Sequence, residues 1–171
     1  MKNFSFLFVL SLLVSSLCFT ACSEDSDPNT DPDPDPIVTN VLTATLTDQS
    51  GTASDWVATG IAATVTGNAI QILAETADGS LLDIEFNADA AGIFAFNTGA
   101  SAVFTEDTET SNANGNRTFG SKEGTGSIII TEFNTTDKSL TGTFSLDVIH
   151  GLSGTTYYLT DGVITNVSYT E

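Results

Sequence analysis

The sequence predicts an all-β protein, and three observations carry this prediction. Leu140–Val148 alternates apolar or glycine residues with polar ones, which is typical of a strand with one buried and one solvated face. Asp78-Gly79 separates two further strand-like runs, 70–76 and 81–86, as the turn of a β-hairpin does. No segment between residues 37 and 171 carries a convincing helical pattern.

We expect nine or ten strands between residues 37 and 171, each bounded by turn residues. In the first half, Leu42, Ala44 and Leu46 alternate with threonines, and the hairpin runs follow after a segment at 54–58. That segment could form one helical turn, but Gly60 and the threonines after it favour a strand. Further strands are predicted at 93–96, which follows Gly92, and from 103–104 onward.

The second half of the chain continues in the same way. Turn residues at 134–138 separate a strand at 127–133 from the one at 140–148, and Gly151–Gly154 precedes a strand at 156–160. Asp161-Gly162 is expected to be a turn that leads into a last strand, 163–169. The polar stretch 106–126 is predicted to be a long exposed loop.

Strands with one solvated face have to bury the other, either between two sheets or inside a closed one. Our prediction is a single antiparallel β-sandwich, and the alternative is a closed or partly open β-barrel. Residues 37–171 are enough for one domain with its own core.

The N-terminus predicts an exported protein with a lipid anchor. Residues 4–19 carry no charge and are too short and serine-rich for a membrane-spanning helix, so residues 1–21 resemble a bacterial lipoprotein signal peptide. The apolar run closes on Ala21 and then Cys22, the lipobox pattern in which Cys22 becomes the acylated N-terminus. An ordinary secretory peptide is the alternative.

Residues 22–36 are predicted to be a stalk. All four prolines lie here, alternating with aspartates, and this composition favours an extended polyproline II spacer. Ser23-Glu24-Asp25 is similar to an acidic signal for export to the outer face of the outer membrane, so we expect a surface location, with a periplasm-facing anchor as the alternative.

Composition excludes several function classes. The chain has 22 acidic and 4 basic residues, a formal net charge of −18. Nucleic acids and anionic lipids bind clustered Lys and Arg, so neither is an expected partner. Cys18 leaves with the signal peptide and the lipid occupies the Cys22 thiol, which excludes a disulfide or a cysteine nucleophile.

The search for catalytic and metal sites yields none. The single histidine, His150, is followed by Gly151 and is predicted to be a turn residue rather than a base. Asp83 and Glu85 share one strand face, but opposite the apolar residues, where exposed carboxylates make poor general acids. Residues 106–114 offer oxygens that Ca²⁺ could use, yet without EF-hand spacing, so a solvated acidic loop is the preferred interpretation.

Aromatic residues give the one indication of a ligand surface. Trp56, Tyr157 and Tyr158 are candidate ligand-facing residues because aromatic rings stack on sugars, although aromatic residues in strands more often fill the core. Tyr157 and Tyr158 are adjacent in a predicted strand, so one of them is expected to face outward.

Several segments resemble an uncharacterised family of small Bacteroidetes lipoproteins. Gly126–Thr131, Ser139–Ser145 and Leu159–Val167 match its later strands, and Thr43–Leu46 and Asp55–Ala58 match its opening strand and tryptophan segment. The resemblance covers most of residues 41–169 and implies a lipobox followed by one β-rich domain. It implies no activity.

The sequence therefore predicts a membrane-anchored extracytoplasmic lipoprotein, a non-catalytic monomer that acts in binding or in envelope structure, with a glycan or an envelope protein as its partner. The alternatives are a carbohydrate-binding accessory module and an unrecognised hydrolase that uses carboxylates.

Overall fold

The structure is a computed structural model that describes residues 39–106 and 117–171. Every regular element in these residues is a strand, so the all-β prediction is confirmed. The strands are β1 (Val41–Thr47), β2 (Ala53–Thr66), β3 (Ala69–Thr76), β4 (Leu81–Asn87), β5 (Gly92–Ala95), β6 (Ala100–Glu106), β7 (Arg117–Ser121), β8 (Ser127–Asn134), β9 (Ser139–Ile149) and β10 (Thr156–Thr170).

Eight of these strands form a closed barrel. Going round it, β1, β2, β3, β4, β6, β7, β9 and β10 pair antiparallel, and β10 returns to β1. β8 pairs with β9 outside this ring, and β5 pairs with β8. The observed architecture is therefore the barrel, which was the alternative prediction. The β-sandwich prediction is wrong, because a sandwich consists of two separate sheets and here hydrogen bonds run continuously around all eight strands. Alternation within strands could not distinguish the two, since each buries one strand face.

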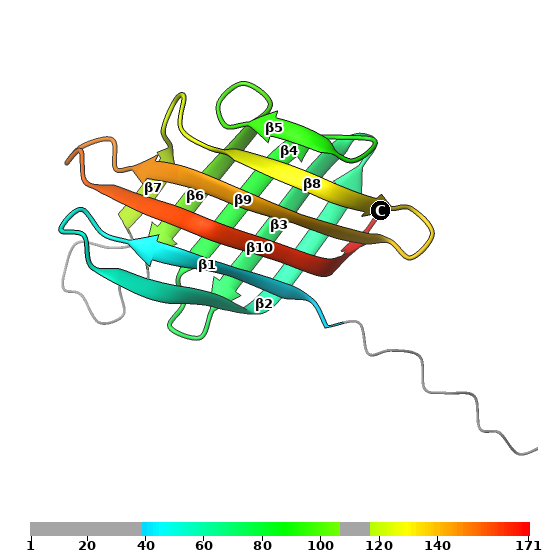
Figure 1. The fold of residues 1–171 in the computed structure, drawn as a ribbon, viewed down its shortest axis with the longest axis horizontal. Helices are drawn as coiled ribbons and strands as arrows, with labels where there is room; N and C mark the ends of the chain where they lie inside the picture. The colour runs from blue at the N-terminus through cyan, green and yellow to red at the C-terminus, as the bar shows by residue number, and fades with distance from the viewer. Residues whose placement is uncertain (1–38, 107–116) are drawn as a thin grey trace, which may run out of the picture. The chain divides into compact units, whose positions relative to one another are not determined.

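The barrel is flattened into two layers whose strands cross (Figure 1). We call β5, β8, β9, β10, β1 and the first part of β2 the front layer, and the rest of β2 with β3, β4, β6 and β7 the back layer. β2 belongs to both: residues 53–57 pair with β1 and residues 58–66 pair with β3. A bulge between Ala58 and Gly60 marks this change of layer, as bulges do at barrel corners.

The core consists of the inward residues of both layers. Leu82, Ile84 and Phe86 of β4 are 0–3% exposed, as their alternation predicts. Phe104 of β6 and Phe119 of β7 are the bulkiest fully buried side chains near the place where the barrel closes. Burying such apolar area is the main source of stability in a domain of this size.

Closure between β7 and β9 is short. Only Gly120↔Ile149 and Ser121↔Val148 pair directly, because β8 pairs with the remainder of that edge of β9. β5 pairs with the outer edge of β8, and the Phe94 ring of β5 packs 5.1 Å from the ring of Phe86 on β4, measured between centroids. The aromatic contact joins β5 back to the barrel.

Two details of the sequence prediction need correction. Asp161-Gly162 is not a turn between two strands but a bulge within the single strand β10, with Asp161 in the left-handed region at φ 52°. The predicted loop at 106–126 contains β7, which has only one buried side chain, Phe119, and so lacks an alternating pattern. Residues 107–116, like the predicted leader, Cys22 and stalk, lie outside the described residues.

We expect Gly126→Ala to lower the free energy of unfolding by about 3 kcal/mol or more. Gly126 has φ +75°, and a Cβ there would lie 1.8 Å from the carbonyl oxygen of Ser145, so β8 could not begin beside β9. Chemical denaturation measures the loss. Gly151→Ala is the control, because a Cβ there meets nothing within 4 Å; equal stability of the two variants would contradict the close approach.

Candidate functional site

The three aromatic residues singled out from the sequence lie in different environments. Trp56 is 3% exposed and belongs to the core, so its ring is not available for stacking on a ligand; its indole N–H has no hydrogen-bond partner among the described residues. Tyr157 faces inward and is half-buried. Tyr158 faces outward and is 38% exposed, which gives the adjacent tyrosines the opposite orientations that a strand requires.

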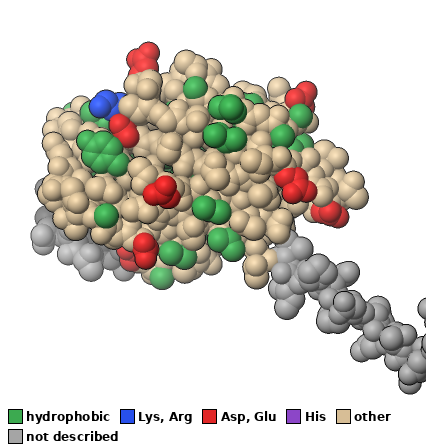
Figure 2. All heavy atoms as spheres, in the orientation of Figure 1, with side chains coloured by type: hydrophobic (Ala, Val, Ile, Leu, Met, Phe, Trp, Pro, Cys, Tyr) green, Lys and Arg blue, Asp and Glu red, His purple; other side chains and the backbone are tan. Residues whose placement is uncertain are grey.

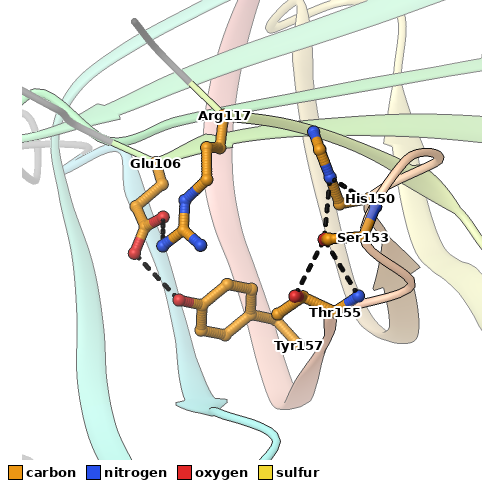
Figure 3. Close-up of polar contacts among 6 residues, drawn as sticks. All are labelled: Glu106, Arg117, His150, Ser153, Thr155 and Tyr157. Carbon is orange, nitrogen blue, oxygen red and sulfur yellow. Dashed lines mark hydrogen bonds and ion pairs between the residues drawn. The ribbon is translucent and has the colours of Figure 1, made fainter. Parts of the chain in front are cut away.

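Tyr157 belongs to a polar cluster at one end of the barrel (Figure 3). Its hydroxyl donates a hydrogen bond of 2.8 Å to Glu106 Oε1, and the other carboxylate oxygen of Glu106 forms an ion pair with Arg117. Burial raises the pKa of the Tyr157 hydroxyl, and the hydrogen bond to Glu106 raises it further. The cluster connects β6, β7 and β10.

Aromatic contacts surround this cluster. The Tyr157 ring lies edge-on to Phe104 and Phe119, with centroids 5.8 and 5.0 Å away, and Arg117 lies over Phe119 at 5.9 Å. His150, the first residue after β9, packs on Phe119 with 5.5 Å between the ring centroids. These contacts bridge the short β7–β9 closure, so we assign the cluster a structural role.

His150 is held by its own turn, as predicted. Its Nδ1 accepts a hydrogen bond of 3.1 Å from the Ser153 backbone N–H, which places the proton of a neutral ring on Nε2. The Ser153 hydroxyl lies 2.8 Å from the same Nδ1 and donates to Thr155 Oγ1 at 2.9 Å (Figure 3). No carboxylate orients the imidazole among these contacts, as a serine-hydrolase triad would need.

A groove of about 570 Å³ lies on the outer face of the back layer. One register row provides its central side chains, because Thr64 pairs with Gln71, Gln71 with Glu85, and Glu85 with Ser101. Asn87 extends the lining along β4. We call this feature the polar groove; its polar side chains carry hydroxyls, amides and one carboxylate, which together donate and accept hydrogen bonds, and its apolar lining includes Ile70 and Phe86.

Two contacts hold the walls of the polar groove in place. The Gln71 amide donates to Asp83 at 3.0 and 3.1 Å and to Glu85 at 3.3 Å, so it bridges the two carboxylates that share this face of β4. Asn97, in the turn before β6, donates to the Ser121 carbonyl oxygen and accepts from the Ser121 hydroxyl, both at 3.0 Å. The groove is therefore built on strands and a braced turn.

A second groove, of about 400 Å³, lies on the outer face of the front layer, along β8, β9 and β10. Ile129, Thr143 and Val163 line it together with the carboxylate of Asp161. Each of the two grooves thus contains one acidic side chain, Glu85 in the polar groove and Asp161 here.

Metal and membrane features were also sought in residues 39–106 and 117–171. No group of three or more His, Cys, Asp and Glu side chains there could hold a metal ion. The same residues contain no helix of the length and hydropathy needed to cross a membrane. Of the candidate calcium segment, residues 106–114, all but Glu106 lie outside the described residues.

Comparison with known proteins identifies the family. Residues 47–168 match a family model described as a domain of unknown function, DUF6252. The chain belongs to this family. The expectation of an uncharacterised family is therefore confirmed, whereas a lipoprotein nature remains a prediction. No curated protein and no solved structure gives a significant match.

The DUF6252 match contains β2 to β9 entire, the last residue of β1 and nearly all of β10. Both grooves and the Tyr157 cluster lie within these bounds. Sequence analysis missed Gln71, Asn87 and Ser101 as a set, because their proximity depends on which strands pair. The only available signal was that Gln71, Glu85 and Asn87 alternate with apolar residues.

We expect Tyr157→Phe to lower the free energy of unfolding of the DUF6252 domain by about 1 kcal/mol at neutral pH, through loss of a partly exposed hydrogen bond to a carboxylate. The folded chain holds the hydroxyl proton more tightly than the unfolded chain. The contribution of the Tyr157 hydroxyl to the free energy of unfolding is therefore fully present below the ordinary tyrosine pKa of 10.0, and it is lost as the pH rises through the raised pKa of the folded chain.

Urea titrations at neutral pH and above pH 10 measure both effects, with Tyr158→Phe as the control. Wild type and Tyr158→Phe should lose stability more steeply with rising pH than Tyr157→Phe does. Identical pH profiles for the two variants would show that the Glu106 contact does not contribute.

Proposed function

We propose that this DUF6252 protein is a lipid-anchored extracytoplasmic module that binds a neutral polar ligand, a glycan, in the polar groove. The anchor rests on the leader and Cys22, whose pattern is that of an acylated lipoprotein. The groove supplies the binding surface. Its volume lies in the range of roughly 300–1,000 Å³ that is usual for small-molecule sites, in which a few polar groups among apolar walls orient the ligand.

The row Thr64–Gln71–Glu85–Ser101 is the observation that carries this proposal. Neighbouring strands lie about 4.8 Å apart, so the row presents hydrogen-bonding groups at regular intervals across the groove. Sugar hydroxyls both donate and accept hydrogen bonds and match such a lining. Glu85 gives the lining one negative charge, which disfavours acidic sugars.

The distribution of carboxylates favours binding over hydrolysis. A glycosidase needs two carboxyl groups that flank the scissile bond. Glu85 is the one acid that lines the polar groove, and Asp83 beside it is tied to the Gln71 amide. Binding in the polar groove needs no second acid.

For the anchor, we expect Cys22→Ser to move the protein from the membrane fraction to the soluble fraction, because the acyl chains provide the membrane affinity. Fractionation with detergent-phase partitioning measures this. Cys18→Ser is the matched control and should leave the protein with the membrane; a membrane-bound Cys22→Ser variant would refute lipidation at Cys22.

For the ligand, the chain from residue 22 carrying Cys22→Ser serves as a soluble protein. On an array of neutral, amino and acidic glycans we expect binding to neutral glycans, with weaker binding to acidic ones. Asn87→Ala should weaken the calorimetric affinity by up to about tenfold, the effect of one lost hydrogen bond.

Tyr158→Ala is the control on the other layer and should bind as the wild type does. Loss of binding through Tyr158 instead would assign the ligand to an aromatic platform and not to the polar groove. If the wild type instead released reducing sugar from the glycan and Glu85→Gln did not, the groove would be a hydrolase site and the binding proposal would be wrong.

A further inference from the structure

The front layer carries a second surface of different chemistry. Outward side chains of six adjacent strands fall into one register row, which we call the β-branched row: Val57, Thr43, Val163, Thr143, Ile129 and Ile93. All six are β-branched and none is charged. With strands about 4.8 Å apart, the row extends roughly 24 Å.

Three of the four apolar members of this row are exposed, and the fourth, Ile129, is half-buried. Ile93, Val57 and Val163 are 72%, 51% and 39% exposed, and they make up three of the seven large apolar side chains that the described residues leave exposed. Single apolar residues scattered over a surface are ordinary, whereas alignment in one row marks an interaction surface.

The front-layer groove lies in the middle of the β-branched row. Ile129 and Val163 line it from β8 and β10, on either side of Thr143. Asp161 contributes a carboxylate from the bulge in β10, two residues before Val163. The groove therefore combines aliphatic walls with one fixed negative charge.

Charge decides which kind of partner fits. Asp161 lines the front-layer groove, and Asp55 is exposed on β2 two residues before Val57. The face seen in Figure 2 displays dispersed acidic side chains with little basic surface. Arg117 and Lys138, two of the few cations, are paired with Glu106 and Glu171. A second copy of this chain, with its net charge of −18, would be repelled.

We propose that the β-branched row and its groove dock an extended protein segment in which aliphatic and basic side chains alternate. Lysine stems would lie on Ile129 and Val163 while the ammonium group reaches Asp161, because long basic side chains bury their methylene stems and keep the charge at a polar site. The polar groove lies on the back layer, so this surface is separate from the proposed glycan site.

The test uses the soluble Cys22→Ser chain and a blocked synthetic peptide, (Lys-Val)4, with (Glu-Val)4 as its negative control. Amide NMR shifts should concentrate at residues 127–129, 143–145 and 161–163. Asp161→Asn should weaken binding about three- to fivefold, the range of an exposed ion pair. Asparagine tolerates the left-handed backbone at this position, so the bulge is retained.

Glu75→Gln is the charge-matched control, since it removes the same charge from an exposed position of β3 on the back layer, and it should change the affinity less than about twofold. Val163→Thr, which keeps the side-chain shape, should also weaken binding. Equal effects of Asp161→Asn and Glu75→Gln, or shifts spread over all acidic surfaces, would reduce the interaction to non-specific attraction and overturn the proposal, as would absence of binding.

Discussion

The position of β10 determines the rest of this structure. As the last strand of the chain, it pairs with β1 on one side and β9 on the other, and it thereby joins the two ends of the folded domain. At its N-terminal end, Tyr157 connects it to Glu106 of β6. Near its C-terminal end, the Ser168 backbone N–H donates to Asn40 Oδ1, which fixes the place where the chain enters β1. Barrel closure thus depends on contacts between residues far apart in sequence.

Pairing of the strands into a barrel aligns the outward side chains of neighbouring strands in rows that run across the sheet. In the ring of eight hydrogen-bonded strands, an outward residue that is paired on both edges of its strand has fixed neighbours on both sides. The back layer brings Gln71 and Glu85 together, and the front layer brings Val163 and Thr143 together. The outer surface of one continuous sheet therefore carries two areas of different chemistry, with hydroxyl, amide and carboxylate groups on the back layer and aliphatic side chains on the front layer.

Much of the fold was predictable because burial acts residue by residue. The alternation at Leu140–Val148 anticipated β9, and the adjacency of Tyr157 and Tyr158 required one ring inside and one outside. The rows were not predictable, since they depend on strand order and register, which no single segment encodes. Neither was the burial of Trp56, because Asp55 and Val57 on either side of it are one polar and one apolar residue and form no alternation that would place the ring inside.

The bulge at Asp161-Gly162 has a consequence for how this family can vary in length. Leu159 and Gly162 both point inward although three positions separate them, so the bulge resets which residues of β10 face the core. Deleting one of the two residues between them would leave Leu159 and Gly162 two positions apart, the spacing of a regular strand, so Ile164 would stay inside while the bulge that carries Asp161 would be lost. A difference of one residue at Thr160-Asp161 is therefore compatible with the fold and should act on the front-layer groove that Asp161 lines, whereas one residue lost from a regular part of β10 would turn the following side chains to the opposite face.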